Sequence, residues 1–525
     1  MFADEWFDMS MVKLKALSGK KNMELLKLPV VFCFPVLLCV VYCLVRGINI
    51  FQLYLPNSYN NDSLFYYKLV EGVLSYGTPQ GYYGFDESRA LVGGFAAWSP
   101  ALLLLWVLWG LVFGWGYGSI LISNIFYFSV ALTVFVYLTK LKWKNICLLF
   151  FVLALYPSLP IHLLSALPEV VVASVMIVYF GFAIRAVKED YKLWCIIPMF
   201  ICSIYLTVCR PYMIILVLLP GYYLMKSKRK YAWLVSVIMV GLGLALYFLC
   251  SHFFTSEYFT PLFDLSVVEL VLEGKITEAF WLSVVYCKET FADIYQFICG
   301  AFSYGLTAGT QYVVAILTVC FSMAFCFSKK RKVQKAVNIT YIVIATSVFC
   351  AILLLLRKAN EGGRHLWVFS VVGCIVCFSN LWGKKMVIAA TMLVGVLGIF
   401  LAKGSMVPTD YDVPAFDEAL KTDIDYWNQI FSDKDLLVSE ELGYENTCIW
   451  VLTDGGEITN HRELYALPKG MGISCCTESY MLANIKKLKS RYIATVVGGT
   501  IDMQCEQNGF EEIGRTDNVV IYKQY

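Results

Sequence analysis

Long apolar runs separated by clusters of lysine and arginine are the feature that most constrains what this chain can fold into. About 20 consecutive apolar residues are enough to cross a bilayer as a helix, and several runs reach that length. Of the 525 residues, 59% are hydrophobic and 15% are charged, whereas about 25% are charged in a typical soluble domain. This composition excludes a soluble enzyme, a nucleic-acid-binding protein and a disordered chain, and it predicts a polytopic α-helical membrane protein.

The basic clusters orient the predicted helices, because cytoplasmic loops carry an excess of lysine and arginine. We therefore place the N-terminal lysines and the clusters at 140–144, 185–192, 226–230, 329–335 and 384–385 in the cytoplasm. No small-residue cleavage site follows the first apolar run, so it reads as a membrane helix and not as a signal peptide. With a cytoplasmic N-terminus and an extracytoplasmic C-terminus, the sequence predicts eleven spans of a plasma membrane: 28–46, 118–139, 145–160, 168–187, 193–209, 211–225, 231–250, 303–327, 336–356, 366–383 and 386–402.

Two apolar stretches, 97–113 and 118–139, compete for the single crossing that this orientation needs between residues 46 and 140. The second stretch is longer and carries no charge. We therefore expect 118–139 to span the membrane, and 97–113 to form a juxtamembrane or re-entrant helix under the first external loop.

The distribution of charge divides the chain. Residues 405–525 hold 20 of the 39 acids but only 10 of the 42 bases, and such a shift marks a domain boundary. The predicted organisation is a cytoplasmic segment 1–27, a transmembrane domain 28–403 with external loops 46–96 and 251–302, and a small extracytoplasmic α/β domain 404–525.

The acidic tail alternates between helical and strand patterns, as an α/β domain does. Apolar spacing predicts helices over 416–431 and 482–489, and short apolar runs predict strands over 436–438, 447–452, 492–497 and 518–522. Trp427 and Trp450 are expected in its core. The tail has four cysteines, which are enough for one or two disulfides if the tail faces an oxidising space. They are Cys448, Cys475, Cys476 and Cys505.

Two acids near apolar segments are candidate catalytic residues. Glu169 follows Pro168 at the predicted outer end of a helix, where an acid is also an ordinary helix start, so a structural role and a substrate-facing role both stay open. Asp62 opens the first external loop, and it is suited either to cap a helix at Ser63 or to take a proton from an acceptor hydroxyl.

The rest of loop 46–96 is a candidate for sugar or acceptor binding. A loop of this length is long for a mere connection, and it is rich in tyrosine. The candidates are Tyr66 and Tyr67 with Asp86, Glu87 and Arg89. An aromatic belt at the membrane interface explains the tyrosines equally well.

A set of external cations breaks the positive-inside pattern: Arg210, Arg357, Lys358, Arg364 and His365. An arginine at a helix end can snorkel to water without any function. The guanidinium fork, however, matches phosphate oxygens, and the glycine pair at 362–363 would let a ligand approach the backbone. We expect these cations to hold the phosphate of a lipid-linked sugar donor.

Further motifs complete an ordered series along the chain. Asp62 and its tyrosines are followed by an aliphatic segment from Trp98-Ser-Pro100 to Phe113-Gly114, then by Glu169, Arg210-Pro211 and finally Arg364-His365. This order resembles that of the GT-C superfamily of membrane glycosyltransferases, which includes protein O-mannosyltransferases and aminoarabinose transferases. The likeness covers roughly residues 28–402. In two places the chain departs from the pattern: Asn61-Asp62 stands where many members have paired acids, and no His-Pro-Pro precedes the aliphatic segment.

The resemblance implies a glycosyltransferase of the cell envelope that moves a hexosyl or pentosyl unit from a polyprenyl-phosphate donor to a glycan, lipid or protein acceptor. It implies inverting single displacement, with Asp62 as the base and Glu169 orienting acceptor or sugar. Arg210, Arg364 and His365 would hold the lipid phosphate, and a groove in the bundle would hold the prenyl chain. No cofactor is assigned, and the sequence leaves the assistance of a divalent metal open.

Two other classes of function stay open. A polysaccharide polymerase or ligase would also use polyprenyl-linked sugars, with the acids of loop 251–302 as its catalytic candidates. A lipid or sugar transporter would favour inverted repeats or charges in the middle of the membrane, and the sequence shows neither. A membrane receptor that uses the tail as a binding module is a further alternative.

Overall fold

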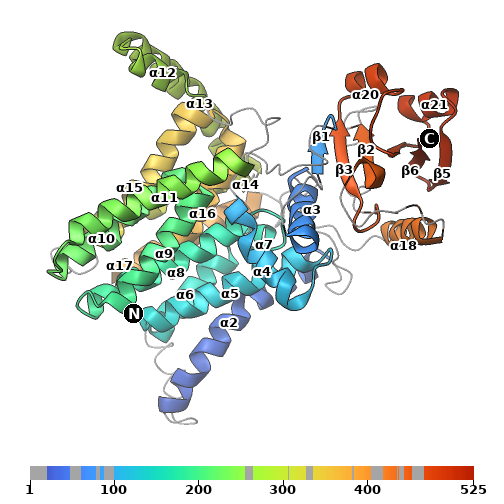
Figure 1. Ribbon diagram of the computed structural model, residues 1–525. Coiled ribbons are helices and arrows are strands. Elements are labelled where there is room, and N and C mark those ends of the chain that lie inside the picture. Colours follow the sequence, from blue (N-terminus) through green and yellow to red (C-terminus); the bar gives the residue numbers. More distant parts are fainter. Residues whose placement is uncertain are drawn as a thin grey trace.

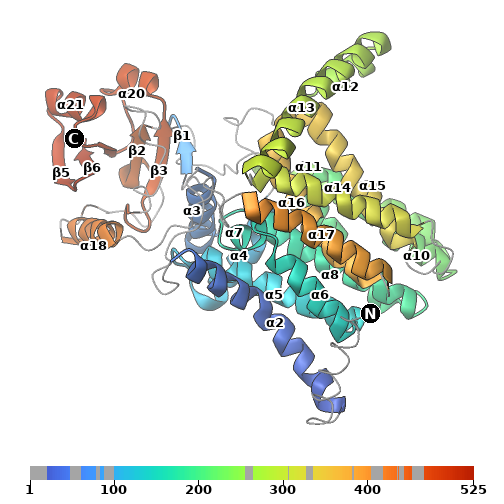
Figure 2. The same ribbon diagram turned by 180° about the vertical axis from the view of Figure 1, so that it is seen from behind.

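The computed structural model describes residues 20–47, 61–77, 83–87, 100–254, 264–304, 307–326, 335–380, 384–403, 418–433, 436, 443–451 and 466–524. Within them the chain forms a helical bundle and a smaller domain built on a six-stranded sheet (Figure 1). The sheet domain lies at one end of the bundle, beyond helix α3 (Asn61–Tyr76), in the front view and from behind (Figure 2). The predicted fold class, a polytopic helical membrane domain followed by a small α/β domain, is confirmed.

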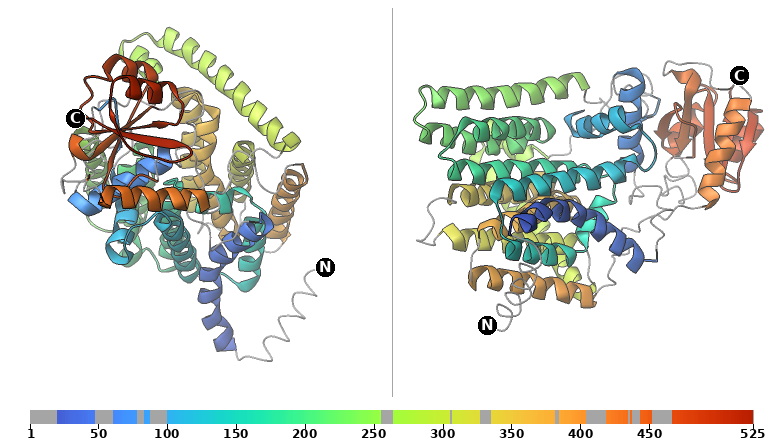
Figure 3. Two further views of the ribbon diagram at one scale, coloured as in Figure 1. Left: turned by 90° about the vertical axis from the view of Figure 1, so that its right-hand side faces the viewer. Right: turned by 90° about the horizontal axis from the view of Figure 1, so that it is seen from below.

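Six of the described helices are long and apolar enough to cross a membrane. At 1.5 Å per residue, about 20 residues match the roughly 30 Å of hydrocarbon in a bilayer. Their axes run roughly parallel when the molecule is seen from below (Figure 3). They are α2 (Lys20–Val45), α5 (Ser119–Thr139), α8 (Glu169–Lys188), α11 (Ala232–Phe254), α14 (Thr307–Cys326) and α15 (Lys335–Ala351), which a π-helical turn, Ile352–Leu356, continues.

The other five predicted spans coincide with helices whose apolar stretches are only 10–17 residues long. They are α6 (Trp143–Ala154), α9 (Leu193–Cys209), the 3₁₀ turn η3 (Pro211–Val217) with α10 (Leu218–Lys226), α16 (Ala359–Asn380) and α17 (Lys384–Lys403). The prediction of 145–160 as one span is wrong, because α6 ends at Ala154 and a separate short helix, α7 (Ser158–Leu163), begins after Pro157. A proline disfavours helical conformation in the residue before it.

Helix α8 is the centre of the bundle and packs against α5, α9 and α16. Gly181 lets α8 approach α5 closely, because a Cβ at this position would lie 3.3 Å from the Cα of Phe135. Small residues at such crossings allow close backbone packing in membrane helices. Most side chains of α8 are buried, which includes its first residue, Glu169.

The described part of the stretch 97–113 forms a short helix packed against the bundle. A 3₁₀ turn, Pro100–Leu103, leads into α4 (Leu104–Phe113), which is ten residues long and thus about 15 Å. Two tyrosine hydroxyls fasten the segment to the bundle: Tyr127 donates to the carbonyl of Leu105 at 2.6 Å, and Tyr205 donates to that of Ala101 at 2.9 Å. A short helix is therefore confirmed here, and its juxtamembrane or re-entrant position stays a prediction.

The segment 251–302, treated above as an external loop, is largely helical in its described part. Helix α11 runs on to Phe254, and α12 (Ser266–Leu272) and α13 (Ile276–Tyr304) follow. Helix α13 carries large exposed apolar side chains such as Phe280, Trp281 and Phe291 between charged positions. A search for uninterrupted apolar runs misses amphipathic helices of this kind.

The sheet of the C-terminal domain has the strand order β1-β3-β2-β4-β6-β5. Four strands are parallel: β1 (Tyr83–Phe85), β3 (Gly472–Cys476), β2 (Thr447–Val451) and β4 (Tyr492–Val496). Strand β6 (Val519–Lys523) runs antiparallel to β4, and β5 (Glu511–Arg515) runs antiparallel to β6. Helix α18 (Glu418–Asp433), helix α20 (Glu478–Asn484) and helix α21 (Thr500–Gln507) accompany the sheet.

Helices cover both faces of this sheet, so its central strands are buried on both sides. Trp450 of β2 packs on one face with Trp427 of α18, as expected for the core. Ile449 packs on the other face with Met481 of α20 and Ile501 of α21. Continuous burial of this kind is typical of parallel strands in α/β domains.

The predicted tail elements are confirmed in part. Strands β2, β4 and β6 and helix α18 occur where they are expected. The prediction of a helix over 482–489 is wrong beyond Asn484, and β3, β5 and α21 were not predicted. Of the predicted strand 436–438, residues 437–438 lie outside the described residues, and so do 416–417 of the first helix.

The strand β1 was not predicted, because it comes from the first loop of the membrane domain. It pairs in parallel with β3, with Tyr83 opposite Ile473 and Phe85 opposite Cys475. A segment nearly 400 residues earlier in the chain thus forms one edge of the sheet.

Candidate functional site

The site centres on Glu169, the first residue of α8. Hydrogen bonds fix the chain that leads to it: Trp106 donates to Asn124 at 2.9 Å, and the Asn124 amide donates to the carbonyl of Ser165 at 2.8 Å. The side chain of Glu169 is fully buried. A buried carboxylate requires charged or hydrogen-bonding partners, and two arginines supply them.

Arg210, between α9 and η3, is the first partner. Its Nη2 donates to Oε1 of Glu169 at 2.6 Å, and 1% of its side chain is exposed. Its Nη1 donates to the hydroxyl of Tyr212 at 3.2 Å and contacts Nδ1 of His365. An arginine N–H can only donate, so Nδ1 of His365 accepts and the proton of this imidazole lies on Nε2.

Arg364, in the first turns of α16, is the second partner. Its Nε donates to the same oxygen of Glu169 at 3.2 Å, and its side chain is 18% exposed. The cluster of Glu169, Arg210, Arg364 and His365 therefore has one residue that reaches solvent and three that are buried. The other carboxylate oxygen, Oε2, has no hydrogen-bond partner among the described residues.

The charges of this cluster do not cancel. Two guanidinium groups surround one carboxylate, and the start of α8 adds the partial positive charge of a helix N-terminus. Guanidinium forks and helix N-termini both bind phosphate oxygens. The arrangement is therefore able to hold a phosphate group beside Arg364, with Glu169 fixing the directions of the arginines.

Residues that the sequence analysis did not single out support α16 at this site. The ring of His162, on α7, stacks on Trp367 with centroids 4.3 Å apart. The hydroxyl of Tyr312 donates to the carbonyl of Ala359 at 2.7 Å. Gly362 serves this packing, because a Cβ there would lie 2.5 Å from Ile352 and 2.7 Å from the Tyr312 hydroxyl. No local sequence motif signals these contacts between helices.

The structure separates Arg357 from the cluster. Its guanidinium donates to Asp264 at 3.1 Å and to Glu289 at 2.8 Å, and it lies 3.7 Å from the centroid of the Tyr286 ring. It thereby joins the end of the π-helical turn to α12 and α13. Lys358 lies between Arg357 and Ala359, the first residue of α16.

Helix α3 carries the predicted base and the predicted sugar-binding tyrosines. The backbone of Asp62 lies in its first turn, and the side chain of Asp62 lies outside the described residues. Tyr66 and Tyr67 are buried, with Tyr66 against Trp106 and Tyr67 stacked 5.3 Å from Tyr117. These contacts fix α3 against α4 and the segment before α5.

Asp86 and Glu87, predicted above to bind the sugar or the acceptor substrate, join the first loop of the membrane domain to the C-terminal domain. The Glu87 carboxylate accepts from the backbone N–H of Ser490 at 2.6 Å and of Lys489 at 2.9 Å. The Asp86 N–H donates to the carbonyl of Cys475 at 2.9 Å. Both residues have φ in the left-handed region, which costs free energy unless the surroundings fix it. Arg89 lies outside the described residues.

A second buried carboxylate, Glu71 on α3, was not singled out from the sequence. Its Oε2 accepts from Lys68 at 3.1 Å, and both side chains are 2% exposed. Its Oε1 has no hydrogen-bond partner among the described residues. Glu71 lines a cavity of about 310 Å³ between α3, α4 and the C-terminal domain, together with Trp115 and Lys469.

Neither metal ligands nor disulfides are found in the described part of the chain. No group of three or more His, Cys, Asp or Glu side chains there could hold a metal ion. The four tail cysteines, for which the sequence left disulfides open, are buried free thiols in this structure. Cys475 and Cys476 pack on opposite faces of the sheet, and burial raises the pKa of Cys505 to about 12.

No protein-family model and no curated protein matches the sequence. Solved structures do align with it. An oligosaccharyltransferase from Archaeoglobus fulgidus, in complex with Zn and sulfate, is 12% identical with a TM-score of 0.49, over 88% of this chain and 68% of that one. The same kind of protein, AglB, in complex with an inhibitory peptide and a dolichol-phosphate, is 12% identical with a TM-score of 0.47, over 93% and 71%.

ArnT from Cupriavidus metallidurans, bound to undecaprenyl phosphate, also aligns. It is 11% identical with a TM-score of 0.39, over 93% of this chain and 97% of that one. These proteins are GT-C membrane glycosyltransferases, the superfamily that the motif order resembles. Because every TM-score is below 0.5, the function proposed below rests on the residues of this chain.

Proposed function

We propose that the protein is a membrane glycosyltransferase that moves a sugar from a polyprenyl-phosphate donor to an acceptor hydroxyl. The observation that carries this proposal is the cluster in which Glu169 binds both Arg210 and Arg364 at the start of α8. Its excess positive charge suits the phosphate of a lipid carrier, and it lies in a bundle with six helices long enough to span a membrane.

In the proposed reaction, the acceptor oxygen attacks the anomeric carbon of the donor sugar. The bond between that carbon and the phosphate oxygen breaks, and the lipid phosphate leaves with the electron pair. The acceptor proton passes to the Asp62 carboxylate, the base in the first turn of α3. Arg364, Arg210 and Nε2 of His365 would stabilise the negative charge that grows on the leaving phosphate.

The contacts of Glu169 argue against it as the base, which supports the assignment of that role to Asp62. Oε1 of Glu169 already accepts hydrogen bonds from two arginines, and such partners lower the affinity of a carboxylate for protons. We therefore assign Glu169 as a positioning residue that orients the arginines. The transferred sugar, hexosyl or pentosyl, and the acceptor are left to experiment.

The contacts of Arg357 bear on the alternative of a polysaccharide polymerase or ligase. Asp264 and Glu289, two candidate catalytic carboxylates of such a polymerase or ligase, form ion pairs with Arg357. Hydrogen bonds from Ser266, from Tyr286 and from the Arg357 guanidinium hold the pKa of the Asp264 carboxyl well below its usual range. A carboxylate held in this way is a weak base, so these contacts favour the first loop as the source of the base.

The first experiment measures sugar transfer by the purified full-length protein, offered polyprenyl-phosphate sugars, and separately the binding of polyprenyl phosphate. Asp62→Asn should lower turnover by about 10²- to 10⁴-fold and keep lipid-phosphate binding. Arg364→Ala should weaken that binding by about tenfold or more, because a hydrogen bond to a charged group is worth about 1.5–3 kcal/mol.

Arg185→Ala is the matched control, since it removes an arginine at the other end of α8, and it should leave both measurements unchanged. Arg357→Ala should also keep lipid-phosphate binding. Full turnover by Asp62→Asn would remove the assigned base. Equal phosphate binding by the wild type and Arg364→Ala would contradict the proposed role of the cluster. A test with and without a chelator decides metal dependence.

A further inference from the structure

A second cavity lies far from the arginine cluster. It has a volume of about 490 Å³ and opens between η3 and α10 on one side and the first turns of α15 on the other. Tyr191, which lines it, follows the C-terminal end of α8, whereas Glu169 begins that helix. The 20 residues of α8 separate the two sites by about 30 Å.

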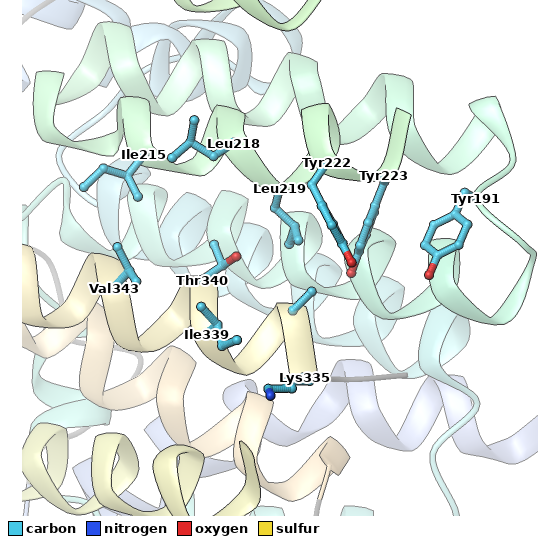
Figure 4. A pocket seen from close by; sticks show the side chains of 11 residues that line it. Tyr191, Ile215, Leu218, Leu219, Tyr222, Tyr223, Lys335, Ile339, Thr340 and Val343 are labelled. Atoms are coloured by element: carbon cyan, nitrogen blue, oxygen red, sulfur yellow. The ribbon is translucent and has the colours of Figure 1, made fainter. Parts of the chain in front are cut away.

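The cavity is amphipathic. Figure 4 shows Ile215 and Val343 toward one end, and Tyr191, Tyr222 and Tyr223 toward the other, with Lys335 near the polar end. On the bundle surface, Leu218, Ile339 and Val343 are exposed, so the apolar end is open to lipid from the side.

The polar end holds an unsatisfied donor. Tyr223 is fully buried, and its hydroxyl has no hydrogen-bond partner among the described residues. Its ring lies 5.1 Å from that of Tyr191 and 6.0 Å from that of Tyr222. A buried hydroxyl without a partner is costly, so an acceptor oxygen of a ligand would stabilise it here.

The surroundings of this end are positive. Lys335 lines the cavity, and no acidic residue does. Helix α10 ends at Lys226, whose ammonium lies 5.5 Å from the centroid of the Tyr222 ring. A ligand that fits both ends has an apolar chain and an anionic head group.

We propose that this cavity binds an anionic phospholipid, with an acyl chain beside Ile215 and Val343 and the phosphate between Lys335 and the tyrosine hydroxyls. Because basic loops face the cytoplasm, the lipid belongs to the cytoplasmic leaflet. The proposal does not depend on the proposed transferase activity, since the cavity shares no residue with the arginine cluster.

The test is a thermal unfolding titration of the purified full-length protein in neutral detergent. The probes are dioctanoyl phosphatidylglycerol, which is anionic, and dioctanoyl phosphatidylcholine, which is not. A ligand that binds the folded state stabilises it by RT ln(1 + [L]/Kd) and thereby raises the unfolding midpoint. We expect phosphatidylglycerol to raise the midpoint and phosphatidylcholine to leave it nearly unchanged at the same concentration.

Four variants locate the binding. Lys335→Gln should weaken the apparent affinity for phosphatidylglycerol about fivefold, the effect of one cation near a lipid head group, and Lys335→Arg should restore it. Lys228→Gln, the same change at an exposed lysine outside the cavity, should leave the affinity unchanged. Ile339→Trp, at an exposed position of the cavity wall, should abolish the rise of the midpoint with lipid. It should leave the midpoint measured without lipid nearly unchanged.

Equal midpoint shifts with the two lipids would overturn the proposal. So would an equal loss of affinity in Lys335→Gln and Lys228→Gln, since that would indicate general attraction to the basic end of the bundle. Persistence of the rise in a folded Ile339→Trp protein would place the lipid elsewhere.

Discussion

At the scale of single residues, Glu169 shows how a structural and a functional assignment can both hold. It begins α8 behind Pro168, as an ordinary helix start does, and its side chain also connects α9 and α16 through Arg210 and Arg364. Arg210 is as deeply buried as Glu169, so the two depend on each other. Removing one partner of a buried pair leaves an uncompensated charge.

We expect Glu169→Gln to destabilise the protein by about 3–5 kcal/mol, because Arg210 would stay buried without its counter-charge. The measurement is the unfolding midpoint in detergent. Arg185→Ala, which breaks a partly exposed ion pair with Glu189 at the far end of the same helix, should change stability by less than about 1 kcal/mol. A similar small loss in Glu169→Gln would show that Arg210 is held by other groups.

Asp502 of α21 gives the C-terminal domain a defined response to acid. Partial burial acts to raise its pKa, but hydrogen bonds from Tyr522, the Gly498 N–H and Arg515 outweigh burial and lower it. A carboxyl group with a lowered folded-state pKa contributes stability above its unfolded pKa of about 3.9. It loses this contribution as the pH falls through the folded value.

The stability difference between the wild type and Asp502→Asn should therefore be about 1–3 kcal/mol at pH 7 and should shrink below about pH 4. Unfolding midpoints of the full-length protein between pH 7 and pH 3 give this difference. A difference that does not change with pH would show that the Asp502 charge contributes nothing.

At the scale of elements, β1 is the clearest case of a structure made by distant partners. Three residues have too few hydrogen bonds to form a strand alone, and β1 exists because β3 offers its edge. The turn after it is fixed by bonds from the Glu87 N–H to Ser474, from Tyr480 to the Asp86 carbonyl and from Tyr444 to the Glu87 carbonyl. The first membrane loop is in this way bound into the C-terminal domain.

Glu87→Ala should weaken this junction, because it leaves the buried N–H of Ser490 and the partly buried N–H of Lys489 without their acceptor. Each unsatisfied buried donor costs about 1–3 kcal/mol. Limited proteolysis of the full-length protein should cut within 466–524 faster in Glu87→Ala than in the wild type. Glu512→Ala, at an exposed position of the same sheet, is the control, and equal cutting in both variants would refute the role of Glu87.

At the scale of the whole molecule, the two parts are arranged around one end of the bundle. Glu169, Arg210 and Arg364, which were predicted to lie on the external side, meet at this end, and the sheet domain lies beyond α3 at the same end (Figures 1 and 3). The basic end, with Lys226 and Lys335, lies at the other ends of the helices. The proposed phosphate site thus lies at one end of the bundle, and the amphipathic cavity lies at the other.

The sequence by itself determined the membrane class, most helix positions and the α/β character of the tail. These follow from hydrophobicity and from periods of 3.6 and 2 residues, which act over neighbouring positions. It also singled out Glu169 as a catalytic candidate and Arg210, Arg364 and His365, together with Arg357 and Lys358, as phosphate-binding candidates. Polar residues at the ends of apolar runs are unusual enough to be noticed.

Only the tertiary structure decided which of these residues meet. The contact between Glu169 and both arginines, the separate engagement of Arg357 by Asp264 and Glu289, and the pairing of β1 with β3 all join segments far apart in the chain. Helix packing also gave Gly362 its role against Ile352 and Tyr312. Such contacts depend on how helices cross and which edge a sheet leaves open, and no local pattern of residues encodes that geometry.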